Sequence, residues 1–389
     1  MITLSLLSLA MLSKSEPMAQ SNGFAPERLA VIPLRMKQSV QEGEIAGTVV
    51  LIQRHGKTVL LDLQGLANVE EKRPMAHDTI FQIMSMTKPI TTIALMICVE
   101  RGLVNLNDPV ERYLPNLSKL QVKQPDGSLR LKKNRLTVRQ LVTHTAGFSS
   151  IDPGGLDDIQ KVKLTLMEYA EKLHEEPLIA EPGTQISYSG PGFAAAGRIV
   201  EIVSGKTLDV FMQTEMFGPL GMKDTSFFAP KEKYPRIASM YYSEHGSLRK
   251  LEENPFRIGA KYANPAGGLY STASDMATLL GCLADGGKKG RFRLLSPAGV
   301  TAMTTLQTGG LLSDGSDNQG YGLGFAVVRN PSGTADLKSV GSYGHVGAYS
   351  TEFWTDPKSG IVAVFMSQSF SGGVRTTFNT LVNAAFVGP

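Results

Sequence analysis

Hydrophobic positions follow two different patterns along the chain, and the two patterns occupy different regions. Near the ends, short apolar runs predict β-strands over residues 46–53 and 58–65, and again over residues 350–355 and 361–367. A turn that contains glycine joins the strands of each pair, which is typical of antiparallel hairpins. Residues 322–328 are a further candidate strand near the second pair. The pattern therefore predicts one antiparallel sheet to which both ends of the chain contribute.

The middle of the chain instead has apolar positions at helical spacing, separated by stretches rich in glycine and proline. The expected helices are residues 85–102, 138–143, 163–173 and 192–203, a short one within 204–222, and a last one over 376–386. An α+β fold accounts for both patterns, with an antiparallel sheet flanked by helices and a mostly helical lobe inserted into it. We assign residues 23–105 and 255–389 to the sheet-containing lobe and residues 106–254 to the helical lobe.

Residues 1–22 stand apart from these patterns and are expected to be a leader or a disordered tail. Residues 2–12 are apolar like the core of a secretion signal, but no Lys or Arg precedes them. The sequence is therefore compatible with either a cytoplasmic or a periplasmic protein. No other stretch is long and apolar enough to cross a bilayer, so no membrane span is expected.

Composition narrows the range of partners. Of the 389 residues, 42% are hydrophobic and 19% are charged, which is ordinary for a globular protein. The net charge of +4 is small, and the basic cluster within residues 130–135 has no interleaved aromatic side chains. We interpret that cluster as a solvated loop and expect no nucleic-acid partner. The two cysteines form no disulfide framework and the six histidines lack metal-binding spacing, so neither a metal nor a cofactor is expected. The sequence carries no signal for an oligomeric state.

The strongest candidate for chemistry is the sequence Ser85-Met86-Thr87-Lys88, at the start of an expected apolar helix. Residues three apart on a helix share a face, so the Ser85 hydroxyl and the Lys88 amine would meet across one turn. The helix N-terminus favours negative charge, such as that of an attacking alkoxide. Serine needs a base to accept its proton, and a lysine in a desolvated pocket has a lowered pKa that suits this role. The pattern by itself is common in proteins, so its meaning depends on the rest of the chain.

The rest of the chain makes the pattern recognisable. Residues 81–88, Phe-Gln-Ile-Met-Ser-Met-Thr-Lys, resemble the nucleophile motif of class C β-lactamases, D,D-peptidases and family VIII carboxylesterases. Further stretches resemble these serine hydrolases in the same order, from about residue 25 to the C-terminus: residues 103–110, 136–147, 182–190 and 264–276. The resemblance implies a fold like that of β-lactamases and penicillin-binding proteins, with the active site between the two lobes. It also implies a covalent acyl-enzyme on Ser85.

The second motif of these proteins is led by a tyrosine, and the resemblance places Tyr188 in that position, near Ser85 and Lys88. An adjacent Lys88 ammonium would stabilise a phenolate and so lower the pKa of Tyr188. The three side chains would then share one proton. Whether Lys88 or Tyr188 takes the proton from Ser85 stays open at this point.

The third motif of these proteins is a strand, and residues 345–347, His-Val-Gly, match it. Gly347 would let this strand approach the substrate closely. The backbone N–H groups of Ser85 and Ala348 would form the oxyanion hole. His345 is either a polar contact to the substrate or an ordinary strand histidine.

Two positions depart from the family pattern. The Asn expected two residues after the tyrosine is Gly190, and the Lys of the third motif is His345. In β-lactamases those two residues help to hold the amide and the carboxylate of the β-lactam, so their loss disfavours β-lactam hydrolysis. With Gly190, His345 and Gly347 at the substrate site, we expect a serine carboxylesterase that hydrolyses short-chain esters of small molecules.

The sequence leaves some other functions open and argues against others. A β-lactamase, a D-amino-acid peptidase or an acyltransferase would use the same acyl-enzyme, and a non-catalytic binding module is a third possibility. No Gly-x-Ser-x-Gly elbow stands at a strand-to-helix turn, which argues against an α/β-hydrolase. We interpret His144 as a structural residue near the site rather than as the base of a Ser–His pair.

Overall fold

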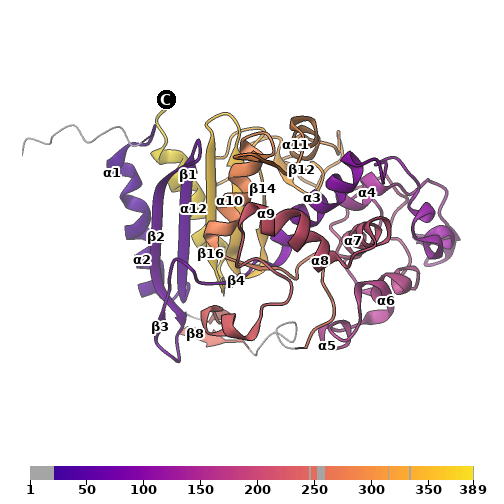
Figure 1. Ribbon diagram of the computed structural model, residues 1–389, viewed down its shortest axis with the longest axis horizontal. Helices are drawn as coiled ribbons and strands as arrows, with labels where there is room; N and C mark the ends of the chain where they lie inside the picture. The colour runs from indigo at the N-terminus through magenta and orange to yellow at the C-terminus, as the bar shows by residue number, and fades with distance from the viewer. Residues whose placement is uncertain (1–21, 245–246, 252–258, 314, 333, 389) are drawn as a thin grey trace, which may run out of the picture.

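The computed structural model describes residues 22–244, 247–251, 259–313, 315–332 and 334–388 (Figure 1). The leader or tail expected over residues 1–22 therefore lies, except for Asn22, outside the described residues.

The central feature is an eight-stranded sheet in the order β12-β13-β14-β15-β16-β1-β2-β3, with every neighbouring pair antiparallel. Its strands are β1 (Gly47–Arg54), β2 (Lys57–Asn68), β3 (Arg73–Pro74), β12 (Gln319–Tyr321), β13 (Ala326–Val328), β14 (Tyr343–Gly347), β15 (Thr351–Asp356) and β16 (Ile361–Ser367). Strand β1 pairs with β16 from Thr48↔Ser367 to Arg54↔Ile361, which brings the two ends of the chain together. In Figure 1 the indigo strand β1 accordingly lies close to the yellow strands from the C-terminal region. The predicted antiparallel sheet is confirmed.

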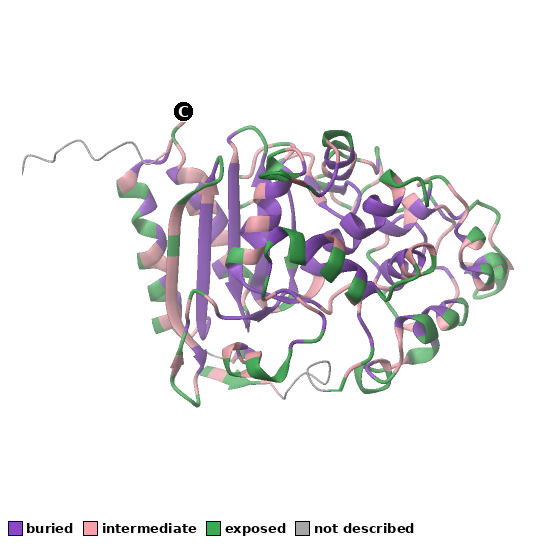
Figure 2. Cartoon of the chain, in the orientation of Figure 1, coloured by how far each residue is buried: buried purple, intermediate pink, exposed green. Residues whose placement is uncertain are grey.

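Helices cover both faces of the sheet, and successive side chains of β1 point alternately into the two cores. Val50 and Ile52 belong to a core with helices α1 (Pro26–Leu29), α2 (Val31–Gln41) and α12 (Gly372–Ala385). Val49 and Leu51 point to the other face, which is covered by α10 (Ala273–Ala284). Burying an aliphatic side chain of this size contributes about 1.5–3 kcal/mol. Because β16 is buried on both faces, its sequence is an unbroken apolar run from Ile361 to Met366. Figure 2 shows that the central strands are almost wholly buried.

The remaining helices form most of the other side of the molecule (Figure 1). They are α3 (Thr87–Glu100), α4 (Val138–Val142), α5 (Asp158–Lys161), α6 (Leu166–Glu171), α7 (Pro191–Ser204), α8 (Leu208–Met212) and α9 (Gly218–Leu220), with α11 (Pro297–Thr304) beside the sheet. Helix α3 is buried over nearly its whole length and packs against α7. Gly205 follows α7 in the left-handed conformation, with φ of +69°, and ends the helix where the sequence predicted.

Short strands are interspersed among these helices. The hairpin β7 (Tyr241–Glu244) and β8 (Ser247–Lys250) falls inside the segment expected to be mostly helical, and β7 pairs in parallel with β17 (Ser369–Phe370). The small pairs are β4 (Phe81–Gln82) with β9 (Tyr270–Ser271), β5 (Gln121–Lys123) with β6 (Leu129–Leu131), and β10 (Lys288–Lys289) with β11 (Phe292–Arg293). The β4–β9 pair matters most here, because β4 lies just before Ser85.

Two expected elements begin three or more residues later than predicted. The strand expected over residues 322–328 starts only at Ala326, because Gly324 takes a φ of +79°. A Cβ at Gly324 would lie 2.3 Å from the Thr92 hydroxyl oxygen, so this turn lies directly against α3. The helix expected over residues 163–173 starts at Leu166, because Thr165 caps it in a capping box with Glu168.

Among the described residues, none of the helices combines the length and apolar character needed to cross a membrane.

Candidate active site

Ser85 lies in a tight turn that precedes helix α3. The turn is the 3₁₀ helix η1 (Met84–Met86), and α3 begins only at Thr87, two residues later than the sequence predicted. In a 3₁₀ helix, residues three apart are nearly eclipsed. The Lys88 Nζ accordingly lies 3.1 Å from the Ser85 Oγ, within hydrogen-bonding distance. Met84 has a φ of +48°, so this turn also holds a residue in the left-handed region.

Lys88 is buried, with an exposed fraction of 3%. Its amine donates to the carbonyl oxygen of Ala266 at 2.8 Å and lies 4.6 Å from the ring centroid of Tyr188 and 5.8 Å from that of Phe193. Burial lowers the pKa of Lys88 from its ordinary value of 10.5 to about 7. A large share of the amine is therefore uncharged at neutral pH, as expected for a lysine that accepts the serine proton.

Tyr188 completes a cluster of three functional groups. Its hydroxyl is hydrogen bonded to Ser85, so the groups brought together by the resemblance are in contact. The expected lowering of the Tyr188 pKa is wrong, because burial of the hydroxyl raises its pKa to about 12. The residue as a whole keeps an exposed fraction of 42%, since its ring lines a pocket while the hydroxyl end points inward. A phenol with this pKa stays protonated at neutral pH, which leaves the uncharged amine of Lys88 as the group able to accept a proton.

His144 fixes the segment that carries Tyr188. The backbone N–H of Ser187 donates to the His144 carbonyl at 2.7 Å, and the N–H of Ser189 donates to the His144 Nδ1 at 3.0 Å. The imidazole is also stacked on the Tyr188 ring, with centroids 4.5 Å apart. His144 is 1% exposed and has a φ of +59°, a conformation that a residue other than glycine adopts rarely. It is a positioning residue, in line with the structural role expected from the sequence.

Replacing His144 with leucine is expected to lower kcat on a simple ester about 10-fold to 100-fold, because the Tyr188 hydroxyl would shift from Ser85. An asparagine at this position tolerates a positive φ and offers an oxygen to the Ser189 N–H, so His144→Asn should recover part of the loss. Steady-state kinetics on both variants checks this, with the exposed His174→Ala as the matched control. A role limited to folding predicts equal kcat in both variants once each is shown to be folded.

Gly347 brings the end of strand β14 against the nucleophile turn. A Cβ at this position would lie 2.4 Å from the Ile83 carbonyl oxygen and 2.2 Å from the Thr351 hydroxyl oxygen. The Thr351 hydroxyl also donates to the Ile83 carbonyl at 3.2 Å. Gly347 thus makes a close approach to the protein's own backbone, and its approach to a substrate stays a prediction. This contact holds the end of β14, just before Ala348, against the backbone that leads into the turn of Ser85.

Gly190 and His345, the other two residues expected at the substrate site, differ in their surroundings. Gly190 caps α7 with an ordinary φ of −77°, and a Cβ there would meet only the Ala266 Cβ, at 3.6 Å. The glycine is therefore not required by the backbone, and it leaves open space. His345 is buried on β14, 6.2 Å from the Tyr188 ring between centroids, and its Nδ1 lies 2.7 Å from the Val346 carbonyl oxygen.

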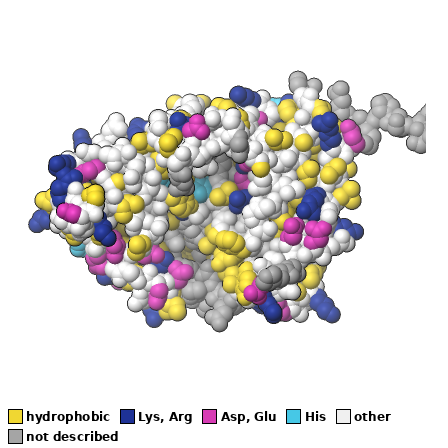
Figure 3. Space-filling model, turned by 180° about the vertical axis from the view of Figure 1, so that it is seen from behind, with side chains coloured by type: hydrophobic (Ala, Val, Ile, Leu, Met, Phe, Trp, Pro, Cys, Tyr) yellow, Lys and Arg dark blue, Asp and Glu magenta, His cyan; other side chains and the backbone are white. Residues whose placement is uncertain are grey.

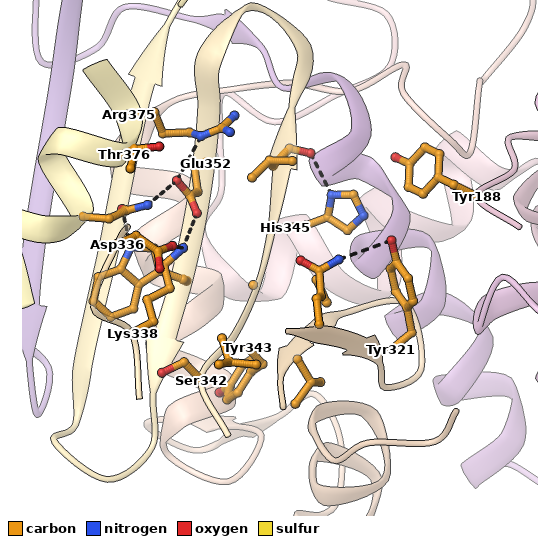
Figure 4. A pocket seen from close by; sticks show the side chains of 18 residues that line it. Tyr188, Tyr321, Asp336, Lys338, Ser342, Tyr343, His345, Glu352, Arg375 and Thr376 are labelled. Carbon is orange, nitrogen blue, oxygen red and sulfur yellow. Dashed lines mark hydrogen bonds and ion pairs between the residues drawn. The ribbon is translucent and has the colours of Figure 1, made fainter. Parts of the chain in front are cut away.

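A pocket of about 320 Å³ opens beside these residues. Tyr188 and His345 belong to its wall, whereas Ser85 and Lys88 lie just outside its lining. Figure 3 shows this face of the molecule hollowed near its middle, with a histidine side chain visible in the hollow and hydrophobic side chains beside it. At the far end, Glu352 accepts from Lys338 at 2.6 Å and forms an ion pair with Arg375 at 3.3 Å (Figure 4). The pocket thus runs from Tyr188, which contacts Ser85, to the charged group of Lys338, Glu352 and Arg375.

No group of three or more His, Cys, Asp or Glu side chains lies in an arrangement that could hold a metal ion within the described part of the chain. Cys98 and Cys282 are free and buried, and burial raises the pKa of each thiol to about 11. Neither cysteine is therefore a competing nucleophile.

Comparison with known proteins identifies the family. The sequence model of the Beta-lactamase family matches residues 34–385 of this chain. The chain belongs to the Beta-lactamase family. The predicted resemblance to these serine hydrolases and the predicted fold are both confirmed.

Individual members of the family are distant in sequence but similar over nearly their whole length. Esterase EstB of Burkholderia gladioli is 27% identical over 378 residues, which cover 87% of this chain and 89% of EstB. Protein Rv1367c of Mycobacterium tuberculosis is 27% identical over 358 residues, which cover 86% of this chain and 88% of that protein. The solved structure of EstCE1, described as a hydrolase with promiscuous acyltransferase activity, superposes with a TM-score of 0.79 at 24% identity, covering 95% of this chain and 99% of EstCE1.

The Ala266 carbonyl, which accepts a hydrogen bond from the Lys88 amine, is a part of this Beta-lactamase family site that was not predicted from the sequence. Asn264 shapes this turn, since its side-chain oxygen accepts from the Ala266 N–H at 2.9 Å. The Asn-Pro-Ala-Gly-Gly sequence at residues 264–268 signals a turn. It does not signal which buried amine the turn would meet.

Proposed function

We propose that this chain is a serine carboxylesterase that hydrolyses short-chain esters of small molecules through an acyl-enzyme on Ser85. The observation that carries the proposal is the contact between the Ser85 Oγ and the Lys88 Nζ, 3.1 Å apart, in surroundings that bring the Lys88 pKa to about 7. A hydroxyl next to an uncharged amine is an activated nucleophile. The site would lie between the sheet-containing lobe and the helical lobe.

In the acylation step, the Ser85 Oγ attacks the ester carbonyl and its proton passes to the Lys88 Nζ. The backbone N–H groups of Ser85 and Ala348 stabilise the oxyanion of the tetrahedral intermediate. The bond from carbon to the alcohol oxygen then breaks, and the leaving alcohol takes a proton from the Lys88 ammonium. The Tyr188 hydroxyl, hydrogen bonded to Ser85, can relay that proton without becoming a phenolate.

Deacylation follows the same route with water in place of the alcohol. Lys88 is again uncharged after the alcohol has left, so it can accept a proton from the attacking water. The carboxylate product leaves when Ser85 recovers its proton. The net reaction consumes one water and returns Lys88 and Tyr188 to their starting states.

Two substitutions favour an ester over a β-lactam. Gly190 offers no side-chain amide, and His345 is an uncharged imidazole, because burial lowers its pKa to about 3. A substrate carboxylate would therefore find no cation at the position where the family motif has a lysine. The name of the relative EstB, an esterase, agrees with this proposal.

The alternatives use the same acyl-enzyme with another substrate or acceptor: a β-lactamase, a D-amino-acid peptidase or an acyltransferase. The description of EstCE1 makes transfer to an alcohol the alternative with the most direct support. In that case an added alcohol would compete with water for the acyl group, and the product would be a new ester.

The test is a substrate panel with purified protein. We expect turnover of p-nitrophenyl butanoate, labelling of Ser85 by a fluorophosphonate, and much slower turnover of a chromogenic cephalosporin and of a D-alanyl peptide. Mass spectrometry of the labelled peptide identifies the residue. Faster turnover of the cephalosporin than of the ester would favour the β-lactamase alternative, and no labelling with no turnover would support a non-catalytic binding module.

A further inference from the structure

The hydrogen bonding of His345 fixes which of its ring nitrogens carries the proton. The Nδ1 lies 2.7 Å from the Val346 carbonyl oxygen, and a carbonyl oxygen can only accept. The Nδ1 must therefore hold the hydrogen and donate it. In the uncharged ring the Nε2 is then a bare acceptor.

This Nε2 has no partner among the described residues, although it is buried. The residue is only 5% exposed and lies in the wall of the pocket. Figure 4 shows the ring turned so that this second nitrogen faces the side of the pocket where Tyr188 lies. Buried acceptors are nearly always paired in folded proteins, so an unpaired one in a pocket wall indicates a place for a donor from outside the chain.

The neighbouring groups keep His345 an acceptor. Burial, and to a lesser extent the nearby charge of Lys88 on α3, disfavours a proton on the Nε2 and lowers the pKa of His345 to about 3. His144 is likewise held uncharged by burial, which lowers its pKa far below the ordinary value. Tyr188 faces the same region as a protonated phenol. The ring therefore presents the same lone pair throughout the neutral pH range.

We propose that His345 is a specificity-determining residue that accepts a hydrogen bond from a hydroxyl or N–H group of the ester, so that the enzyme selects esters with such a donor a few atoms from the reacting carbonyl. This inference rests on the proposed esterase function and names its substrate class. It inverts the role of the lysine that the family motif has at this position, which would attract a carboxylate. Esters that carry a carboxylate at this place are discriminated against, because a carboxylate facing a bare lone pair has no donor.

The test uses two sets of three esters that differ only in one group. On the acyl side these are 3-hydroxybutanoate, 3-methylbutanoate and succinate mono-esters of p-nitrophenol. On the alcohol side they are butanoate esters of ethylene glycol, propanol and glycolate. We expect the hydroxyl ester to exceed its methyl counterpart about fivefold to tenfold in kcat/KM in at least one set, which shows on which side of the ester the donor lies.

The variants then assign this preference to the imidazole. His345→Phe keeps the ring but removes the acceptor, so the hydroxyl-to-methyl ratio should fall to about one. His345→Gln keeps an acceptor and should retain part of the ratio, and His345→Lys should move the preference to the carboxylate ester. Val340→Ala, at an exposed position outside the pocket wall, is the control for the ratio.

Two results would overturn different statements. An unchanged ratio in His345→Phe and in His345→Lys, with Ser85 still labelled by a fluorophosphonate, would overturn the inference alone. No labelling and no ester turnover in the wild type would overturn the proposed function. If His345→Phe does not fold, the hydroxyl-to-methyl ratio of His345→Lys is compared with that of His345→Gln instead. Only the glutamine retains an acceptor, so equal ratios in these two variants would also overturn the inference.

Discussion

Replacing Ser85 with alanine is expected to lower kcat/KM on p-nitrophenyl butanoate by at least about 10⁴-fold, to near the uncatalysed rate. The substitution removes the hydroxyl that we propose as the nucleophile, while Ser85, unlike Met84, has no positive φ that would strain an alanine. Lys88, Tyr188 and the oxyanion donors would still bind the ester but would have no nucleophile to assist. Steady-state kinetics and fluorophosphonate labelling measure the loss.

The matched control is Ser118→Ala. Ser118 is an exposed serine in the 3₁₀ helix η3 (Pro115–Lys119), which does not belong to the turn η1 that holds Ser85. That variant should retain the wild-type rate and the wild-type labelling. Ester turnover in the Ser85→Ala variant within tenfold of the wild type would mean that another group attacks the carbonyl, and the acyl-enzyme on Ser85 would have to be abandoned.

Replacing Lys88 with methionine is expected to lower kcat/KM by about 10³-fold or more, since it removes the base while keeping the length of the side chain. In the wild type, kcat/KM should rise with pH and reach half of its plateau near pH 7, because the uncharged amine is the active form and the pKa of Lys88 is about 7. The residual activity of the Lys88→Met variant should not rise with pH around pH 7. A pH–rate profile of both proteins checks the assignment, with the exposed Lys119→Met as the control.

The same substitution should make the protein more stable at neutral pH. The pKa of Lys88 falls from about 10.5 in the unfolded chain to about 7 in the folded one, so between these values the unfolded chain binds the proton and the folded one does not. The stability of the wild type therefore rises with pH across this window, and below pH 7 the full cost of burying the ammonium is present. That cost is of the order of a few kcal/mol.

Methionine has no proton to bind, so the gain in Tm of Lys88→Met over the wild type should be largest at or below about pH 7 and shrink as the pH rises toward 10. Thermal unfolding of both proteins over a series of buffers measures this difference. A gain in Tm that does not depend on pH would show that the amine is not buried as a titrating group. The loss of the hydrogen bond to Ala266 offsets part of the gain in Tm at every pH. The change of the gain with pH, rather than its size, therefore shows whether the buried amine titrates.

Short apolar runs were enough to predict the long strands of the sheet, because a strand that is buried on both faces has hydrophobic side chains at consecutive positions. The run at β16 is an example, since every residue from Ile361 to Ser367 is buried. Helices α1 and α2 were not predicted. They cover the sheet with a few buried side chains, such as Ile32 and Met36, among many exposed ones, and such a sparse pattern gives little signal.

The sequence by itself determined the contact between Ser85 and Lys88, because the two are three residues apart and local geometry alone brings their side chains together. Only the tertiary structure decided what that contact can do. The burial that brings the pKa of Lys88 to about 7, and that keeps Tyr188 a phenol, comes from side chains and backbone groups far away in the chain. The role of His144 was decided in the same way, since it depends on a hydrogen bond to Ser189, and so was the burial of the His345 Nε2 without a partner among the described residues. Spacing along a chain fixes which neighbours can meet, whereas solvent exclusion depends on every element that packs around them.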